Sequence, residues 1–144
     1  MNKEEHEALV NGIYAEYKEL IKKLDKELKD FYQSFEKPLL LSDRLGNSIT
    51  PGQLSVLRAN EAYRTVRQDV IAGLRICTVW LGVNYNFSSE DVIIFKTIFF
   101  DKDGKKIYYE FYSSEEQALR GHFRSIAITE AVISATEART KDSA

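Results

Sequence analysis

Hydrophobic positions repeat every three or four residues along the first part of the chain. Over residues 4–35 the apolar positions follow steps of 4, 4, 3, 4, 4, 3 and 4, which places them on one helix face. The run continues to Pro38, and the residue before a proline is pushed out of the α region. The pattern predicts one long helix with this apolar face: Leu9, Ile13, Tyr17, Leu20, Leu24, Leu28, Phe31 and Phe35.

Such a helix would be long for a domain of this size. The 32 residues span about 48 Å, whereas a compact chain of 144 residues has a radius of gyration of about 15 Å. The overhanging part of the apolar face would need a partner, and a second copy of the chain is the simplest one. The alternative is that the face folds back onto the chain's own sheet. We expect residues 1–37 to form an amphipathic oligomerisation helix.

A linker and a short helix follow the long helix. Residues 38–50 contain turn-forming side chains and read as the linker. Thr50 is a suitable N-cap, Pro51 suits the first helical position, and Gln53 completes a capping box. We expect this short helix to end near Asn60.

Alternating and β-branched side chains then predict an antiparallel sheet over residues 63–112. Asp103-Gly104 is a strong hairpin-turn signal before the last strand. Residues 92–100 are the most apolar stretch, so we expect a central strand that is covered on both faces. The expected strands are residues 63–71, which end at Ala72-Gly73, and residues 74–81, 92–100 and 107–112.

The last element is a helix over residues 114–135. Ser113 and Glu116 have the spacing of a capping box, and residues 137–144 read as a polar tail. The expected fold class is therefore α+β. A small antiparallel sheet of three or four strands is flanked by the long N-terminal helix and the C-terminal helix, and residues 38–136 form the ligand-binding body.

Composition and charge narrow the function classes. Lys and Arg number 20 against 22 Asp and Glu, so general nucleic-acid binding through a basic surface is not expected. Cys77 is the single cysteine, which excludes an internal disulfide, and only His6 and His122 are available for metal or histidine chemistry. No apolar run approaches the roughly 18 residues of a membrane span, and the acidic start does not resemble a signal peptide. We expect a cytoplasmic protein without cofactor, metal or catalytic residues.

Arginines and aromatic residues gather in the middle of the chain. Five of the eight arginines fall within residues 44–75, and arginine is the planar, bidentate partner of phosphate. Trp80, Tyr85 and Phe87 surround a polar stretch that also contains Asn84. Together these groups suit an adenine–phosphate ligand, through stacking, base-edge hydrogen bonds and charge. The alternative is a solvated face with surface ion pairs.

His122 is the only histidine in a segment expected to be structured. It lies on the mostly apolar face of the C-terminal helix. Either it packs as a hydrogen-bonded core side chain or it contacts a ligand. Without further histidines a metal site is not expected.

Five segments of the chain stand in the order of a known pattern: IT at 49–50, YRTV at 63–66, CTVWLGVNYNF at 77–87, IIFKTIFF at 93–100 and YSSEEQALRGH at 112–122. Through these segments the chain resembles a family of small proteins encoded by many phages and prophages, in which STVWLG, FET and YST…EA..GH segments follow one another. Tyr85 stands where that family has a histidine and Lys96 where it has a glutamate, so the charge preference of a site there would differ.

The family is in turn similar to the first type of Thoeris anti-defence protein, a phage sponge for cyclic ADP-ribose signals. The resemblance implies an immune-evasion sponge in the host cytoplasm that binds a cyclic adenosine-derived nucleotide without cleaving it. The first alternative is a phage inhibitor that binds a host defence protein, of the anti-CRISPR or anti-restriction type, and the second is a nucleotide-processing enzyme. A sponge predicts a deep polar pocket near residues 82–87, whereas an inhibitor predicts an exposed patch. The expected ligand-binding residues are Arg64, Arg67, Trp80, Asn84, Tyr85, Phe87, Lys96 and His122.

Overall fold

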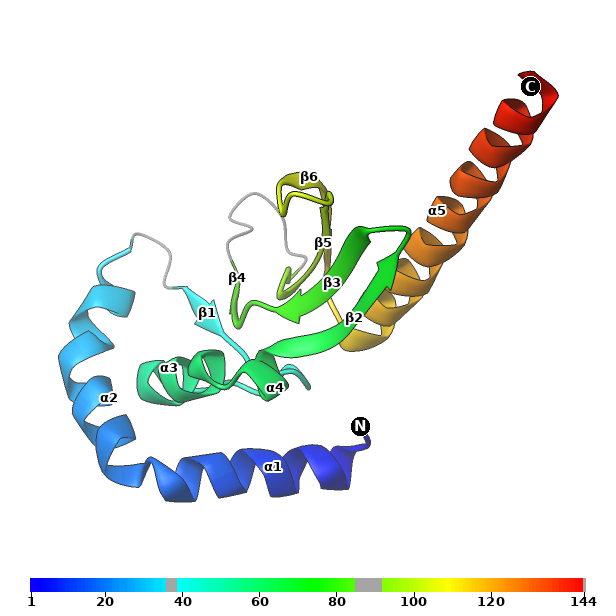
Figure 1. Ribbon diagram of the computed structural model, residues 1–144. Helices are drawn as coiled ribbons and strands as arrows, with labels where there is room; N and C mark the ends of the chain where they lie inside the picture. The colour runs from blue at the N-terminus through cyan, green and yellow to red at the C-terminus, as the bar shows by residue number, and fades with distance from the viewer. Residues whose placement is uncertain (36–38, 85–91, 144) are drawn as a thin grey trace.

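The computed structural model of the chain describes residues 1–35, 39–84 and 92–143. It confirms the α+β class, with a four-stranded antiparallel sheet, a second sheet of two short strands, N-terminal helices and a C-terminal helix (Figure 1). In the described part of the chain, no helix is long and apolar enough to cross a membrane.

The main sheet has the predicted four strands, each antiparallel to its neighbour. Ala72 and Gly73 adopt φ values of 51° and 84°, as the tight turn between the first two strands requires. The Asp101 carboxylate accepts hydrogen bonds from the amides of Asp103 and Lys105 in the second predicted hairpin. The strands lie in this order: β2 (Thr65–Ile71), β3 (Leu74–Trp80), β5 (Phe95–Phe100) and β6 (Lys106–Tyr112).

Two short segments differ from the prediction. The first expected strand begins two residues late, because Asn60 caps a helical turn, α4 (Glu61–Arg64), with its side chain accepting from the amide of Tyr63. In the expected linker, β1 (Leu40–Leu41) pairs with β4 (Val83–Asn84) and forms the small second sheet. The helical turn follows from a local cap that the strand pattern obscured, whereas the β1–β4 pairing is a tertiary effect that the local pattern does not contain.

The single long N-terminal helix is a wrong prediction. The chain forms α1 (Lys3–Glu16) and α2 (Lys18–Gln33), which meet at Tyr17. Tyr17 leaves helical geometry at φ −108° and ψ 24°, caps the end of α1 and begins α2. Figure 1 shows α1 and α2 turning around α3 instead of continuing in one line. The bend lets each half pack on the body, which the straight helix would overhang.

Helix α3 (Pro51–Ala59) has the predicted capping box between Thr50 and Gln53. It lies directly against α2, because the amide of Gly52 donates to the Asp25 carboxylate at 2.7 Å. A Cβ atom at Gly52 would lie 2.4 Å from the carbonyl oxygen of Ile21. The backbones of the two helices therefore approach as closely as a glycine permits.

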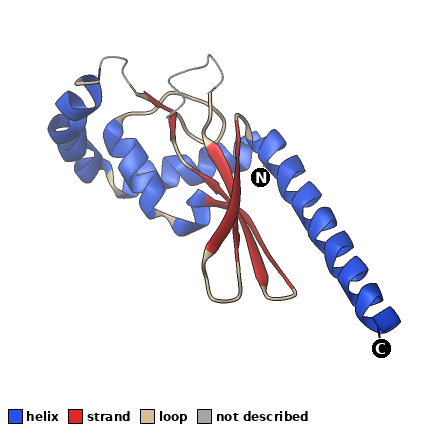
Figure 2. Cartoon of the chain, turned by 90° about the horizontal axis from the view of Figure 1, so that it is seen from above, coloured by secondary structure: helices blue, strands red, loops and turns tan. Residues whose placement is uncertain are grey.

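The C-terminal helix, α5 (Glu115–Ser143), is longer than predicted. It continues to Ser143, so the polar tail expected from residue 137 is helical instead. Its start is also shifted by one residue: Ser114 accepts from the amide of Gln117, whose side chain accepts from the amide of Ser113. Figure 2 shows α5 running along one side of the sheet and projecting past it.

The main core lies at one end of the sheet, where α1, α3 and α5 meet it. Trp80 and Phe95 are almost fully buried there, and the Trp80 ring packs edge-on against the buried Tyr63 at a centroid distance of 5.1 Å. Leu54 and Leu57 of α3 complete this cluster. The expectation that residues 92–100 are covered on both faces is wrong, because α5 packs on one face and Ile98 and Phe100 stay partly exposed on the other.

We expect Gly52→Ala to lower the free energy of unfolding by about 1–3 kcal/mol, the usual cost of overpacking. The added methyl group must separate α2 from α3 and weaken the Asp25 hydrogen bond. Gly12→Ala in α1 is the matched control, because its Cβ meets nothing within 4 Å and Gly→Ala in a helix normally stabilises by about 1 kcal/mol. Urea unfolding monitored by circular dichroism measures both. Equal effects of the two variants would contradict the close α2–α3 contact.

Candidate functional site

Strand register sorts the side chains of the sheet into two faces. Thr78 on β3 lies opposite Arg67 on β2 and Thr97 on β5, and neighbouring residues of a strand point to opposite faces. Thr78 and Thr97 point toward α5, whereas Cys77 and Lys96 point away from it. We call these two sides the α5 face and the open face.

On the α5 face, a chain of hydrogen bonds joins α5 to three strands. The two ring nitrogens of His122 have separate partners: Nε2 lies 2.7 Å from Oδ2 of Asp69, and Nδ1 lies 2.7 Å from the Thr78 hydroxyl. The Thr78 hydroxyl is in turn 2.5 Å from the Thr97 hydroxyl. His122, Thr78 and Thr97 are all fully buried. Their hydrogen bonds therefore offset the cost of burying two ring nitrogens and two hydroxyl groups between helix and sheet.

Asp69 is the charged end of this series of hydrogen bonds. Its carboxylate also accepts from Nε of Arg67 at 2.8 Å, and the Arg67 guanidinium lies over the Phe123 ring at 4.7 Å. The hydrogen bond from His122, followed by that from Arg67, lowers the pKa of Asp69 below its usual value. Asp69 is therefore held as a carboxylate at neutral pH.

The order Asp69–His122–Thr78 has the geometry of a hydrolase triad, in which a carboxylate orients a histidine beside a hydroxyl. Here the hydroxyl of Thr78 and the ring of His122 are both fully buried beneath α5. A substrate cannot reach a hydroxyl in that position without displacement of the helix. The arrangement fits a structural clamp that fixes α5 on the sheet.

The open face carries cations and aromatic rings from three strands. Arg75, Phe100 and Lys106 form one row across β3, β5 and β6, and Lys96 is paired with Phe111 further along. Tyr109 lies between them and is 52% exposed, while Phe111 is 46% exposed. The Arg75 guanidinium lies 4.0 Å from the centroid of Phe100. We call these residues the open-face cluster: Arg75, Lys96, Phe100, Lys106, Tyr109 and Phe111.

Two lysines of the open-face cluster converge on one ring. The ammonium of Lys96 lies 4.8 Å from the Tyr109 centroid and 5.4 Å from that of Phe111, and the ammonium of Lys106 lies 6.0 Å from Tyr109. Partial burial and then the neighbouring Lys106 lower the pKa of Lys96. Among the described residues, no carboxylate lies within 4.0 Å of either ammonium. Within the described chain the pair is therefore a positive site without a carboxylate partner above an aromatic surface, which favours an anion.

The structure separates the residues that the sequence predicted as one site. Arg67 and His122 belong to the α5 face, whereas Lys96 belongs to the open face. Arg64 donates to the carbonyl of Arg58 at 2.8 Å. It also lies near Cys77 on the open-face side. Burial raises the pKa of the Cys77 thiol, and the positive charges of Arg75 and Arg64 oppose that rise. Three pockets of the described chain, beside α2 and α3, beside the small sheet and at the start of β6, contain none of these side chains.

The remaining predicted residues do not form a ligand surface in the described part of the chain. Trp80 is 1% exposed and donates its indole N–H to the carbonyl of Ser42 at 3.0 Å, so its ring is a core group and stacking on a ligand is excluded. Asn84 accepts from the amide of Ile93 at 3.1 Å beside the small sheet. Tyr85 and Phe87 lie outside the described residues.

Sequence reasoning missed five members of the open-face cluster: Arg75, Phe100, Lys106, Tyr109 and Phe111. The alternation of residues 106–111 holds a signal for two of them, because Tyr109 and Phe111 share one strand face. Arg75 is one of the five central arginines, but the sequence does not show which residues it lies beside. That depends on the pairing of β3 with β5, which sets Arg75 opposite Phe100. Lys106 joins the cluster because the register between β5 and β6 shifts between Phe99 and Phe100, which sets Lys106 opposite Phe100.

Comparison with known proteins adds no family assignment: no family model, curated protein or solved structure matches the chain. Within residues 1–35, 39–84 and 92–143, no group of three or more His, Cys, Asp or Glu side chains is placed to hold a metal ion. The chemistry of the chain therefore has to be inferred from its own side chains.

We expect Asp69→Asn to destabilise the protein by about 1–2 kcal/mol at pH 7, the scale of a hydrogen bond to a charged group. Because the folded-state pKa of Asp69 lies below the usual 3.8, its contribution is present above pH 3.8 and disappears as the pH falls through the folded-state value. Urea unfolding from pH 2 to 7 should therefore show wild type and variant converging in acid.

Asp103→Asn is the control for this measurement. Asp103 lies exposed in the β5–β6 turn, where only its backbone amide makes a hydrogen bond. That variant should follow the wild type at every pH. If Asp69→Asn does the same, the clamp on α5 does not contribute to stability in the way described.

Proposed function

We propose that this chain is a non-catalytic binding protein whose open face takes an anionic ligand of nucleotide type. The finer proposal follows from the family resemblance. The protein would be a phage-encoded sponge that sequesters a cyclic ADP-ribose-type signal in the host cytoplasm without cleaving it. Self-association and the absence of general nucleic-acid binding are part of the same proposal.

One observation carries the proposal: Lys96 and Lys106 share the Tyr109 ring with no carboxylate to neutralise them in the described chain. Two neighbouring ammonium groups repel each other, which costs stability in the free protein. Proteins tolerate such costs chiefly at functional sites. A phosphate placed between the two ammoniums would remove the repulsion and add charged hydrogen bonds.

The aromatic rings beneath the lysines would bind the base of the nucleotide by stacking. In the free protein, Lys96 lies over both Tyr109 and Phe111, so its ammonium occupies the ring faces. A phosphate that draws the ammonium away would free those faces for a nucleobase. Base–aromatic stacking is worth about 1–3 kcal/mol per base. An anion that also carries a base therefore fits the cluster better than inorganic phosphate.

The cluster has the means to bind such a ligand but few means to transform it. Its six members include no carboxylate and no histidine, the groups that most often serve as general acid or base. The only histidine near the sheet is His122, which is fully buried on the other face. This separation supports binding without turnover.

A second candidate function is inhibition of a host defence protein. It is favoured by the position of the cluster on an exposed face, where Val70, opposite Arg75, is also 65% exposed. An exposed patch of aromatic and cationic groups is the form that a docking surface for an acidic partner protein takes. The two functions differ in whether a free nucleotide binds.

The experiment that distinguishes them begins with the purified protein incubated with a panel of cyclic adenosine-derived nucleotides. Heat release followed by mass spectrometry then identifies what was bound. Intact ligand supports the sponge, modified ligand contradicts the absence of catalysis, and no ligand moves the inhibitor proposal ahead.

For any nucleotide that binds, we expect Lys106→Gln to weaken the affinity by about 10–100-fold, since a charged hydrogen bond contributes about 1.5–3 kcal/mol. The same variant should unfold at equal or higher urea concentration than the wild type, because it removes the repulsion with Lys96. Isothermal titration calorimetry and urea unfolding give the two values.

Two controls accompany that variant. Lys105→Gln changes the adjacent, exposed lysine in the turn and should leave the affinity within about two-fold at moderate salt, where exposed charges are screened. Arg67→Ala removes a cation from the α5 face and should also leave the affinity within about two-fold. Loss of binding in Arg67→Ala, with full binding in Lys106→Gln, would place the ligand on the wrong face for this proposal.

A further inference from the structure

Helix α2 exposes large apolar side chains that the fold does not cover. None of its residues is buried, although its neighbour α1 buries three. Leu20 is 44% exposed, Phe31 is 57% exposed, and Tyr17 at the start of the helix is 42% exposed. At 3.6 residues per turn these positions lie along one side of the helix. The adjacent side, with Ile21 and Asp25, is the one that packs on α3.

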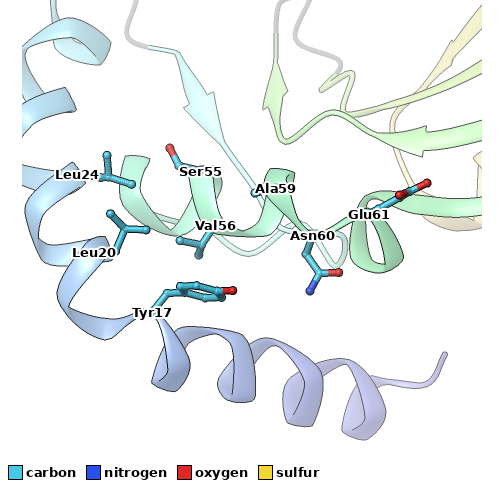
Figure 3. A pocket seen from close by; sticks show the side chains of 8 residues that line it. All are labelled: Tyr17, Leu20, Leu24, Ser55, Val56, Ala59, Asn60 and Glu61. Carbon is cyan, nitrogen blue, oxygen red and sulfur yellow. The ribbon is translucent and has the colours of Figure 1, made fainter.

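A groove runs beside this exposed stripe. It has a volume of about 340 Å³ and lies between Tyr17, Leu20 and Leu24 on one side and α3 residues such as Val56 and Ala59 on the other. Figure 3 shows the side chains of Leu20 and Leu24 directed from α2 toward α3. Ser55, Asn60 and Glu61 also line the groove, so it joins an apolar α2 side to a mixed side on α3 and α4 (Figure 3). Its apolar side is open to a side chain that comes from outside the chain.

The same helix carries an aromatic group suited to such a groove. Phe31 lies eleven residues after Leu20, which is three turns or about 16.5 Å along the helix. Its ring is the most exposed of the large apolar groups on α2. Exposed aromatic anchors that enter a pocket on the partner are typical of the residues that dominate interface energies.

The stripe is complementary to itself in the antiparallel direction. A two-fold axis between residues 25 and 26 places Leu20 opposite Phe31 of a second copy, and Tyr17 beside Phe35 of that copy. Because a two-fold interface is reciprocal, both grooves receive a Phe31 ring at once. Leu24 and Leu28 meet near the axis.

Charges along the edge of the stripe favour the same arrangement. Lys23, Glu27 and Asp30 lie in one row next to Leu20 and Phe31, all exposed, and none has an ion-pair partner among the described residues. In the antiparallel register, Lys23 lies between Glu27 and Asp30 of the second copy. A parallel pairing would instead place the two copies of this row on opposite sides of the interface, where Lys23 could not contact Glu27 or Asp30 of the second copy.

We propose that α2 pairs antiparallel with α2 of a second copy of this chain, with Phe31 of each copy inserted into the α2–α3 groove of the other. The bend at Tyr17 makes this possible, because it turns α2 away from α1 and exposes its stripe (Figure 1). The pairing involves none of the open-face cluster. It rests on the self-association in the proposed function, but a failed dimer test would leave the ligand on the open face unaffected.

The first test is the mass of the full chain by light scattering from 1 to 100 μM. We expect a dimer for the wild type and a rise of about 30-fold or more in the dissociation constant for Phe31→Ala, as for truncation of an interface anchor. Circular dichroism checks that the variant is folded. A monomeric wild type, or an unchanged constant in folded Phe31→Ala, overturns the proposal.

Charge reversal tests the register without relying on the apolar core. Lys23→Glu should weaken the dimer, the double variant Glu27→Lys/Asp30→Lys should also weaken it, and all three changes together should restore it. Lys26→Glu is the matched control, since it lies on the side of α2 opposite the stripe and should leave the dimer unchanged. Failure of the triple variant to recover contradicts the antiparallel register.

Disulfide trapping distinguishes the two orientations directly. Chains carrying Leu20→Cys are mixed with chains carrying Phe31→Cys under mild oxidation, and the native Cys77 is buried. The antiparallel pair predicts mixed Leu20→Cys–Phe31→Cys dimers by mass spectrometry. Dimers linked through two Leu20→Cys chains would indicate a parallel pair and overturn the proposal.

Discussion

His122 holds α5 on the sheet through both of its ring nitrogens, and the rest of the architecture depends on that contact. One nitrogen meets Asp69 on β2 and the other meets Thr78 on β3, each at 2.7 Å. Hydrogen bonds have a narrow range of length and angle, so two of them in different directions fix both the position and the rotation of the helix. Breaking one would leave a buried polar group without a partner, at a cost of about 1–3 kcal/mol. The clamp therefore specifies where α5 must lie on the main sheet.

The position of α5 decides what the other side of the sheet can do. Because the helix and its polar clamp occupy one face, alternation sends Lys96, Tyr109 and Phe111 to the opposite face. There the cations lie over aromatic rings and have no carboxylate partners in the described chain. Lysine charges that no carboxylate of the described chain balances add little stability to the protein, but they can bind an external anion. The buried histidine on one face and the lysines on the other are thus two consequences of the same pattern of alternating residues.

The local parts of this fold could be predicted from the sequence. The capping box of Thr50 and Gln53, the turn at Ala72-Gly73 and the Asp101–Gly104 hairpin depend on neighbouring residues, and they were predicted correctly. The partners of His122 lie 44 and 53 residues away, so only the folded chain brings them together. The bend at Tyr17 likewise reflects packing on α3, which overrides a continuous helical pattern.

The open-face cluster shows why the candidate site could not be predicted in full. Counting back from the hairpin, with Phe100 opposite Lys106, would set Lys96 opposite Glu110. The register shifts between Phe99 and Phe100, so Lys96 faces Phe111 instead, and Glu110 bonds to tyrosines on the α5 face. A single irregular pair therefore separates Lys96 from Glu110, the carboxylate that a regular register would place opposite it. Nothing in the local sequence marks that irregularity.

The most direct measurement is a nuclear magnetic resonance titration of the labelled full chain with cyclic ADP-ribose, with adenosine as the uncharged comparison. The account predicts that cyclic ADP-ribose shifts the side-chain signals of Lys96 and Lys106 and the ring signals of Tyr109 and Phe111, while adenosine shifts them far less. The signals of Asp69 and His122 should stay in place. Shifts confined to the α5 face, or no shift with either compound, would contradict the assignment of the open face as the binding surface.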